Sequence, residues 1–436
     1  MKRLIEQKVI DWKNSVRRKP LIIRGARQVG KTWLVENFLA SHFDHFAKVD
    51  LEERQDLHEH FSGNLDPKKI VEALELSVGR IVPGKTLLFF DEIQSCPRAI
   101  MALRYFYEKM PELHVIAAGS LLEFAFGDIS IPVGRVQYLY MYPMTFYEYL
   151  LATDKEPMAK LTLCHPGSLS ETVQLKILEE LKTFIFVGGM PECVKVYKES
   201  GSLVETFAVQ REIIESYRDD FSKYRPQIDS TCIDAVFVKA AHSVGEQIKY
   251  TKMNDAHTGP TNRKAIGLLS KARIIHKIYN CSPSGLPLAV SVNASRFKVS
   301  FIDIGLMQSL CEVPISESIL ESDLLAIYHG KLAEQFVGQE MRAKLDSELY
   351  YWSRSAKSSN AEVDFLTTFK EKILPIEVKS GKGGSLKSLH LMLKEYPNCP
   401  EGLVLYSGPY KELKEQKLKF LPLYCAGNLE AILAET

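Results

Sequence analysis

The sequence of 436 residues lacks closely spaced cysteines, long apolar runs and a surplus of charge of one sign. Its eight cysteines stand apart without a Cys-x-x-Cys pair, so a zinc site with that spacing is not expected. Scattered single cysteines are typical of a reducing compartment, and the charged N-terminus lacks the apolar core of a signal peptide. No apolar stretch is long enough to span a bilayer. We therefore expect a cytoplasmic protein that makes no membrane contact.

The charge balance excludes a general attraction to nucleic acid, because the formal net charge is only +1. Any contact with DNA therefore needs a local basic face. With 46% apolar and 25% charged residues, the composition is that of an ordinary globular protein. At roughly 100–200 residues per domain, the length predicts about three domains.

Short apolar runs alternate with helical segments in the first part of the chain. The expected strands are residues 21–23, 45–51, 86–90 and 114–118, and the expected helices are residues 4–16, 33–40, 70–82 and 103–110. This alternation is typical of a doubly wound α/β domain with a parallel sheet, which we assign to residues 1–150.

The pattern changes after residue 143. Residues 145–225 are expected to be mainly helical with a break near Gly188, Gly189 and Pro191, and residues 231–280 to form a small helical bundle. A helix at 262–272, a strand at 274–279 and a second strand starting in 288–292 suggest a winged helix. Residues 151–324 are therefore predicted as a helical lid and winged-helix-like region.

Residues 325–436 are predicted as a third, α/β domain. Its expected elements are a helix at 331–344, strands at 349–354, 362–369 and 373–378, a helix at 386–395 and a last strand at 401–406.

Residues 25–32 match the P-loop pattern G-x-x-x-x-G-K-[ST] and lie between an expected strand and helix. Its glycines permit backbone angles that aim N–H groups at phosphate oxygens, and the helix start adds its positive dipole end. Lys31 is expected to reach the β- and γ-phosphates of ATP, and Thr32 to ligate Mg²⁺. The predicted ATP-binding residues are Gly25, Ala26, Arg27, Gln28, Val29, Gly30, Lys31, Thr32, Trp33 and, further along, Asp91.

Asp91 and Glu92 follow an apolar strand about 60 residues after the P-loop. An acidic pair at a strand end is by itself more often a solvated turn. After a P-loop, however, this pattern favours Asp91 as part of the Mg²⁺ shell. Glu92 is then placed to polarise the water that attacks ATP.

Two further residues complete the predicted catalytic set of Glu92, Lys31, Ser120 and Arg135. Ser120 ends the strand at 114–118, which should lie beside the first strand, so its hydroxyl could bond the γ-phosphate or the water. A simple turn is the alternative. Arg135 lies on a loop, and an arginine supplied to a neighbour's phosphate would stabilise transition-state charge, although an ordinary surface arginine is commoner.

Several segments occur in an order that resembles a known family. They are residues 22–32, 90–94, 119–120, 134–136, 142–146, 188–192 and 301–306. The chain is similar to bacterial and archaeal AAA+ ATPases, related to the archaeal-type ATPases, that carry an uncharacterised C-terminal region. The resemblance covers nearly the whole chain. It implies an AAA+ core, a winged-helix-like middle and a restriction-endonuclease-like C-terminal domain, with DNA or further copies of the chain as partners.

The C-terminal part contains the elements of a PD-(D/E)xK nuclease pattern. Twelve residues separate Asp364 from Glu377, and Lys379 follows Glu377 on the same strand face. Asp364 and Glu377 could hold Mg²⁺, which would activate water, while Lys379 could orient that water or balance charge. Glu334 on the preceding helix matches the extra acidic residue of this fold. Val363 stands where the pattern's name has proline, and an inactive or regulatory site remains the alternative.

Basic residues gather around the expected recognition helix and wing, where they could contact phosphates of DNA. They are Lys249, Lys252, Arg263, Lys264, Lys271, Arg273 and Lys277. The alternative is a solvated helix face.

The sequence leads to three functional hypotheses. The first is an ATPase that couples hydrolysis to DNA binding or processing, and the second is an ATP-gated switch or scaffold with an inactive nuclease-like domain. The third is a DNA-binding regulator with weak ATPase activity. Glu92 beside Asp91 favours ATP hydrolysis over mere ATP binding. The complete set of acidic residues and lysine in the nuclease pattern favours the first hypothesis over the second. The nearly neutral net charge of the chain mildly favours the second.

Overall fold

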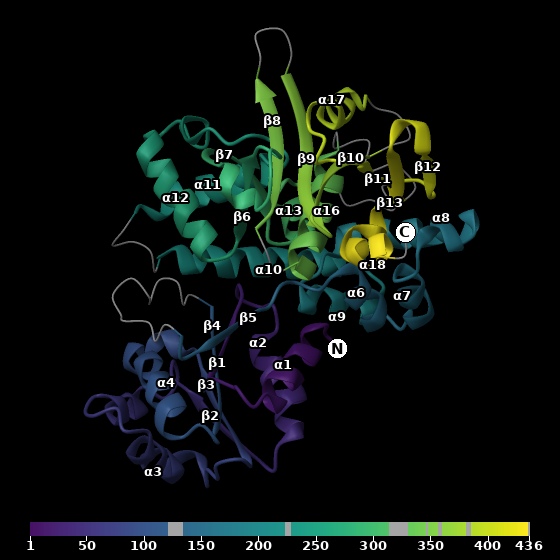
Figure 1. The fold of residues 1–436 in the computed structure, drawn as a ribbon. Helices are drawn as coiled ribbons and strands as arrows, with labels where there is room; N and C mark the ends of the chain where they lie inside the picture. The colour runs from purple at the N-terminus through teal and green to yellow at the C-terminus, as the bar shows by residue number, and fades with distance from the viewer. Residues whose placement is uncertain are drawn as a thin grey trace. The chain divides into compact units, whose positions relative to one another are not determined.

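The chain forms two compact units in a computed structural model that describes residues 1–120, 134–222, 228–313, 330–345, 348–355, 360–380 and 385–434 (Figure 1). The P-loop unit consists of residues 2–142 with 271–273. The C-terminal unit consists of residues 143–270 and 274–436, together with Met1. In the described residues, no helix has both the length and the apolar character that a membrane span requires.

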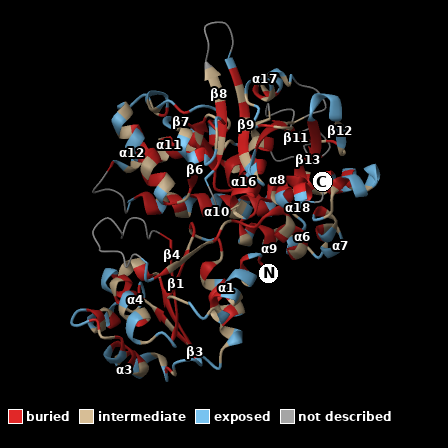
Figure 2. Cartoon of the chain, in the orientation of Figure 1, coloured by how far each residue is buried: buried red, intermediate tan, exposed pale blue. Residues whose placement is uncertain are grey.

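A five-stranded parallel sheet organises the P-loop unit, in the order β2-β3-β4-β1-β5. Its strands are β1 (Leu21–Arg24), β2 (His45–Asp50), β3 (Thr86–Asp91), β4 (His114–Gly119) and β5 (Gln137–Tyr140). Every residue of β3 and β4 is buried, as expected for strands covered on both faces (Figure 2). The predicted parallel α/β sheet, with the strand before Ser120 beside β1, is confirmed.

Helices cover this sheet, and their ends follow local sequence signals. They are α1 (Ile5–Asn14), the helical run α2 (Lys31–Trp33), η1 (Leu34–Leu39) and η2 (Ala40–His42), then η3 (Gln55–Phe61), α3 (Pro67–Val78), η4 (Ile93–Ser95) and α4 (Pro97–Lys109). The predicted extension of α3 to residue 82 is wrong because Gly79 ends the helix with φ +84°. The predicted start of α4 at residue 103 is also wrong, since Pro97 begins it.

The first half of the C-terminal unit is helical, as predicted. It contains α6 (Phe146–Ala152), α7 (Glu156–Thr162), α8 (Glu171–Val187), α9 (Pro191–Ser200), α10 (Leu203–Phe221), α11 (Ser230–His242), η7 (Tyr250–Lys252) and α12 (Gly259–Lys271). The predicted break after α8 occurs at Gly188, which has φ +73°. The next amide, Gly189 N, donates to the buried Asp303 carboxylate at 2.6 Å, which fixes the break.

The second half contains a mixed eight-stranded sheet in the order β12-β13-β11-β10-β9-β8-β6-β7. Its strands are β6 (Ile275–Cys281), β7 (Val292–Phe301), β8 (Tyr350–Ser355), β9 (Asn360–Phe369), β10 (Lys372–Lys379), β11 (Gly402–Tyr406), β12 (Lys411–Leu413) and β13 (Leu418–Pro422). Helices α13 (Ile304–Leu310), α16 (Lys331–Leu345), α17 (Lys387–Glu395) and α18 (Leu429–Ala434) accompany them. The helix–strand–strand–strand–helix–strand order predicted from residue 331 onward is present.

The hairpin that the sequence predicts as a wing belongs to this sheet. Strands β6 and β7 pair antiparallel, and β6 pairs in parallel with β8. The last five residues of β7 are all buried, because they pack within the unit instead of projecting as a wing. The strand starts at Val292, after the 3₁₀ turn η8 (Leu288–Ser291). The sheet thus includes strands from both sides of the predicted boundary at residue 324, which itself lies outside the described residues.

Candidate functional site

The P-loop joins the end of β1 to the helical run that starts at Lys31. Gly25 lies against the carbonyl of Met141, where a β-carbon would collide with backbone. Gly30 has φ +95° directly before the helix, a conformation that glycine adopts without strain. The exposed Gln28 also has positive φ, at 63°. The loop therefore has the backbone conformation expected where N–H groups converge on phosphates.

Lys31 is buried and its ammonium group lies within the loop. Its Nζ donates to the carbonyl oxygens of Gly25 at 3.1 Å and Ala26 at 2.7 Å. It also donates to the hydroxyl of Ser120 at 3.3 Å. The parallel pairing of β4 with β1 brings Ser120 to this position, next to the predicted phosphate-binding lysine.

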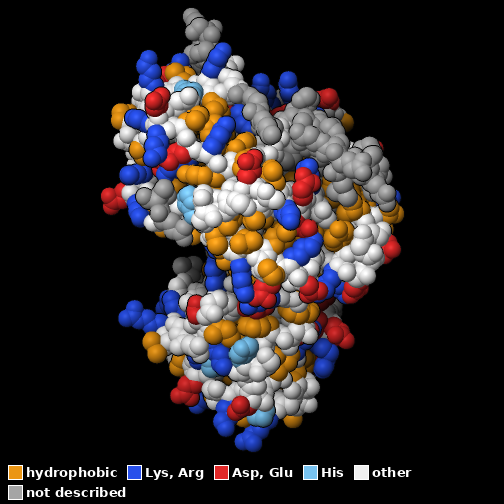
Figure 3. Space-filling view, turned by 90° about the vertical axis from the view of Figure 1, so that its right-hand side faces the viewer, with side chains coloured by type: hydrophobic (Ala, Val, Ile, Leu, Met, Phe, Trp, Pro, Cys, Tyr) orange, Lys and Arg blue, Asp and Glu red, His pale blue; other side chains and the backbone are white. Residues whose placement is uncertain are grey.

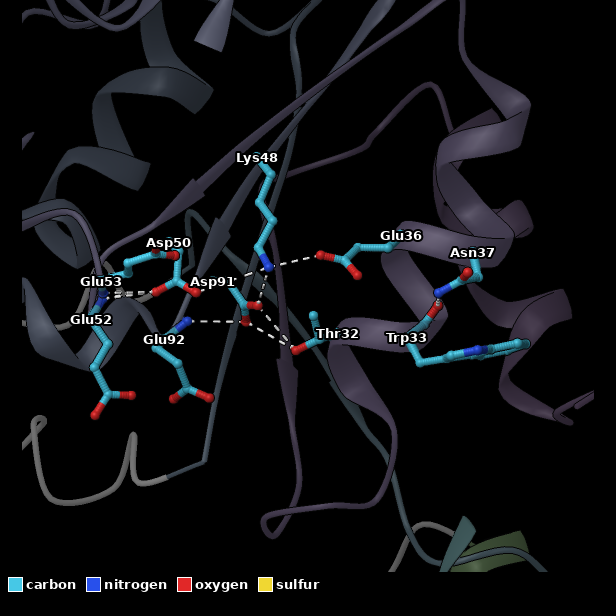
Figure 4. Close-up of polar contacts among 10 residues, drawn as sticks. All are labelled: Thr32, Trp33, Glu36, Asn37, Lys48, Asp50, Glu52, Glu53, Asp91 and Glu92. Carbon is cyan, nitrogen blue, oxygen red and sulfur yellow. Dashed lines mark hydrogen bonds and ion pairs between the residues drawn. The ribbon is translucent and has the colours of Figure 1, made fainter. Parts of the chain in front are cut away.

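Asp91 and Thr32 meet at the carboxyl ends of β3 and the P-loop. The Thr32 hydroxyl donates to Asp91 Oδ2 at 3.0 Å (Figure 4). Glu92 follows with φ 44°, and its carboxylate accepts a hydrogen bond from the Gln94 amide. A hydroxyl beside a carboxylate fits Mg²⁺, which is usually held by few protein oxygens together with substrate phosphates.

Sequence reasoning missed Lys48, which lies on β2 beside β3. Its ammonium nitrogen is 2.7 Å from Glu36 Oε1 and 3.3 Å from Asp91 Oδ2 (Figure 4). Burial, opposed by the charge of Lys48, raises the pKa of Asp91. Burial lowers the pKa of Lys48, but Glu36 and Asp91 outweigh it and the pKa is raised. Lys48 could be assigned to this site only once the strand order was known.

Two predicted residues lie on the surface of the P-loop unit. The Arg135 side chain is 45% exposed and pairs with Glu108 at 3.1 Å. Its predicted role therefore depends on a second copy of the chain. The Trp33 side chain is also exposed, in the helical run after the P-loop (Figure 4).

A second cluster of charged side chains lies in the C-terminal unit. The hairpin of β9 and β10 brings Asp364 beside Glu377, as predicted, and Val378 N donates to Asp364 Oδ2 at 2.8 Å. Lys379 Nζ donates to Glu377 Oε1 at 2.7 Å, since both side chains lie on one strand face. Glu334 on α16 joins the cluster through a lysine that sequence reasoning missed.

That lysine is Lys298 on β7, with a side chain only 1% exposed. Its Nζ lies 3.0 Å from Glu334 Oε1, 2.6 Å from Glu362 Oε1 and 3.6 Å from Asp364 Oδ1. Burial lowers the pKa of Lys298, but the three carboxylates raise it well above its usual value. Burial also raises the pKa of Glu334 to about 7. A lysine within the apolar end of a strand was the available sequence signal.

The predicted Mg²⁺ site at Asp364 and Glu377 does not fit this arrangement. Lys298 and Lys379 already contact one oxygen of each carboxylate. Burial raises the pKa of Glu377 to about 8, which disfavours the charged form that binds metal. Across the described ranges, no group of three or more His, Cys, Asp or Glu side chains is arranged to hold a metal ion.

Comparisons with protein families match three parts of the chain. Residues 17–150 match an AAA domain. Residues 178–317 and 329–426 match two domains of unknown function, DUF8612 and DUF4143. The first match supports an AAA+ ATPase that binds ATP. The other two leave the winged-helix and nuclease-like assignments as predictions. The comparison with curated proteins gave no match.

Solved structures with partial likeness include a Walker-type ATPase of Pyrococcus abyssi, with 16% identity over 70% of this chain and 95% of that one, at a TM-score of 0.46. The RuvB Holliday junction branch migration motor of Thermotoga maritima has 12% sequence identity over 62% of this chain and 85% of that one, with a TM-score of 0.31. A structure of Drosophila ORC bound to DNA has 11% sequence identity over 71% of this chain and 94% of that one, with a TM-score of 0.24.

Proposed function

We propose that this chain hydrolyses ATP to ADP and phosphate at the P-loop with Mg²⁺ bound by Thr32 and Asp91. The observation that carries the proposal is the hydrogen bond of 3.0 Å between the Thr32 hydroxyl and Asp91, with Lys31 and Ser120 joined at the neighbouring strand ends. These four side chains come from the P-loop, β3 and the end of β4. A hydroxyl, a carboxylate and an ammonium group together suit a metal-bound triphosphate.

Each residue has a distinct role in the proposed reaction. The Lys31 ammonium group and the amides of residues 25–32 bind and orient the phosphates. Mg²⁺, when bound, neutralises charge on the phosphate oxygens. The Glu92 carboxylate polarises the attacking water and accepts its proton, and Gln94 fixes that carboxylate through its amide. Ser120 positions Lys31 or the water.

Two substitutions test the proposal by separating ATP binding from turnover. Lys31→Ala is expected to weaken ATP binding about 10–100-fold, because a charged hydrogen bond is lost. Glu92→Gln is expected to keep ATP binding and lower turnover about 10²–10⁴-fold. Glu52→Gln makes the same change at a nearby exposed carboxylate and should leave both unchanged. Nucleotide binding and phosphate release would be measured together, and normal turnover by Glu92→Gln would show that Glu92 does not activate water.

We also propose that the chain associates with itself and that Arg135 reaches the phosphates of a second copy. Support comes from the exposure of Arg135 on the surface of the P-loop unit. In the same assay, turnover per chain should rise with protein concentration for the wild type. For Arg135→Ala it should stay low at all concentrations, and equal turnover by both proteins would remove the proposed role.

Coupling to DNA is a second candidate function, supported by exposed basic residues of the C-terminal unit directly before and on η7 and on α12. These residues are Lys249, Lys252, Arg263 and Lys264. On the face of the molecule in Figure 3, basic, acidic and apolar side chains are interspersed. Because the net charge of the chain is only +1, a local basic group must supply any attraction to DNA. The alternative is a switch or scaffold that binds a partner without cleaving it. It is supported by the contacts of Lys298 with the acidic cluster of the C-terminal unit, which includes Glu334 and Asp364.

Salt-dependent binding to duplex DNA decides between these candidates. Reversing the charges of Lys252, Arg263 and Lys264 to glutamate is expected to weaken binding and to lower the salt slope by about 0.9 for each lost phosphate contact. A matched control reverses the exposed Lys68, Lys69 and Lys85 of the P-loop unit. Equal loss in both variants, or no binding by the wild type, would favour the switch.

A further inference from the structure

The acidic cluster of the C-terminal unit contains its own cation. Lys298 reaches it from β7, Glu334 from α16, and Glu362 and Asp364 from β9. Three carboxylates surround the Lys298 nitrogen within 3.6 Å, and the lysine side chain is 1% exposed. Elements far apart in the sequence therefore converge on one ammonium group.

The packing around Lys298 holds this arrangement in place. The ammonium group lies 5.2 Å from the centre of the buried Tyr351 ring. Behind Glu334, Gly245 approaches so closely that a β-carbon there would be 2.8 Å from Glu334 Oε2. Lys298 pairs opposite Ile278 in the β6–β7 ladder, so its backbone is also fixed. The ammonium group is therefore surrounded by a buried aromatic ring and by carboxylates from a helix and a neighbouring strand.

Few carboxylate oxygens remain for a metal ion. Asp364 Oδ2 accepts from the Val378 amide, while Asp364 Oδ1 faces Lys298. Glu377 Oε1 accepts from Lys379, and Glu377 Oε2 is buried without a hydrogen-bond partner. Of the four oxygens of Asp364 and Glu377, only Glu377 Oε2 has no ammonium or amide group against it. Mg²⁺ is usually bound through one or two carboxylates, and here both carboxylates already face a lysine. Two ammonium groups nearby would also repel the ion.

We infer that the ammonium group of Lys298 takes the place of a divalent cation in this cluster, so that the C-terminal unit does not cleave phosphodiester bonds by metal-dependent hydrolysis. The nuclease-like arrangement of Asp364, Glu377 and Lys379 then serves as a fixed structural cluster, in which each carboxylate faces a lysine. This inference does not depend on ATP hydrolysis at the P-loop.

Binding of Mn²⁺ to the full chain without nucleotide tests the inference. The Asp91→Asn background removes the metal-binding carboxylate of the P-loop, so that only the C-terminal cluster is examined. In this background, electron paramagnetic resonance should detect no bound Mn²⁺ at millimolar concentration, and Asp364→Asn should change nothing. One Mn²⁺ per chain that is lost with Asp364→Asn would overturn the inference.

Removing the lysine gives the converse test. Lys298→Met keeps the length of the side chain without its charge, and the folded variant should gain one Mn²⁺ site that Asp364→Asn abolishes. A folded variant that gains no site would overturn the role of Lys298. If Lys298→Met does not fold, the Mn²⁺ measurement on the Asp91→Asn protein with and without Asp364→Asn, in which Lys298 is intact, decides alone.

Nicking of supercoiled DNA provides a second readout. With Mg²⁺ or Mn²⁺, and with or without ATP, we expect no cleavage by the wild type. Cleavage that disappears in Lys379→Ala would overturn the inference.

Discussion

Each unit contains a lysine beside acidic residues, and the two lysines differ in burial. The Lys48 side chain is 32% exposed and lies between Glu36 and Asp91 at the edge of the ATP site. The Lys298 side chain is 1% exposed and lies among three carboxylates. A partly exposed ammonium group can be rehydrated and replaced by Mg²⁺ at low cost, whereas a buried one cannot. On the two proposals above, the ion pairs of Lys48 can exchange with Mg²⁺, whereas those of Lys298 are fixed.

The largest expected difference concerns stability. Lys298→Met should lower the free energy of unfolding by about 3–5 kcal/mol, because it leaves the largely buried carboxylates of Glu334 and Asp364 without their cation. Lys48→Met should lower it by less than about 1 kcal/mol, since its pairs are partly solvated. Urea unfolding of both variants measures the difference, and similar losses would break the comparison. Mn²⁺ should restore part of the stability of Lys298→Met only.

Glu340, a buried acid on α16, extends the comparison to the pH dependence of stability. Glu340 on α16 accepts from the Phe146 amide at 2.8 Å, and burial raises its pKa to about 8. Because the pKa of Glu340 is higher in the folded chain than its unfolded value of 4.5, the protonated carboxyl stabilises the fold fully below pH 4.5. This stabilisation is lost progressively as the pH rises from 4.5 to about 8. The free energy of unfolding should fall over this window by at most about 1.4 kcal/mol per pH unit. Glu340→Gln should flatten the fall, and an unchanged slope would show that Glu340 does not titrate there.

The smallest expected effect is on the Mg²⁺ requirement for ATP hydrolysis. Lys48→Met removes a positive charge 3.3 Å from Asp91, so the half-saturating Mg²⁺ concentration should fall about 2–5-fold. Lys85→Met serves as a control. Lys85 is exposed and pairs with Asp44, and these two residues directly precede β3 and β2, at the ends of the strands opposite to Asp91. A higher Mg²⁺ requirement in Lys48→Met would show that Lys48 assists the metal site instead of competing with it.

The sequence was sufficient for the parts of the molecule that local patterns determine. The P-loop, the strand ending in Asp91 and the strand ending in Ser120 follow from apolar runs and short motifs, and the structure brings Lys31, Thr32, Asp91 and Ser120 together. Helix ends were less predictable, because Gly79 ends α3 and Pro97 begins α4 at positions that apolar periodicity alone does not mark.

Long-range strand pairing explains what the sequence could not reveal. Lys48 meets Asp91 only because β2 pairs with β3, and Lys298 reaches Glu334 only because β7 belongs to the same sheet as β9. The hairpin of β6 and β7 resembles a wing locally, but its pairing with β8 decides its place. A lysine within a buried strand is a signal for such a contact, although its partner cannot be read from one sequence.

The most direct test counts the Mn²⁺ ions bound per chain in the wild type, with and without a non-hydrolysable ATP analogue. An ATP-dependent metal site in the P-loop unit and a lysine-filled cluster in the C-terminal unit predict one ion with the analogue and none without it. Asp91→Asn should then abolish the one site. An ion that binds without nucleotide and is lost in Asp364→Asn would contradict this account.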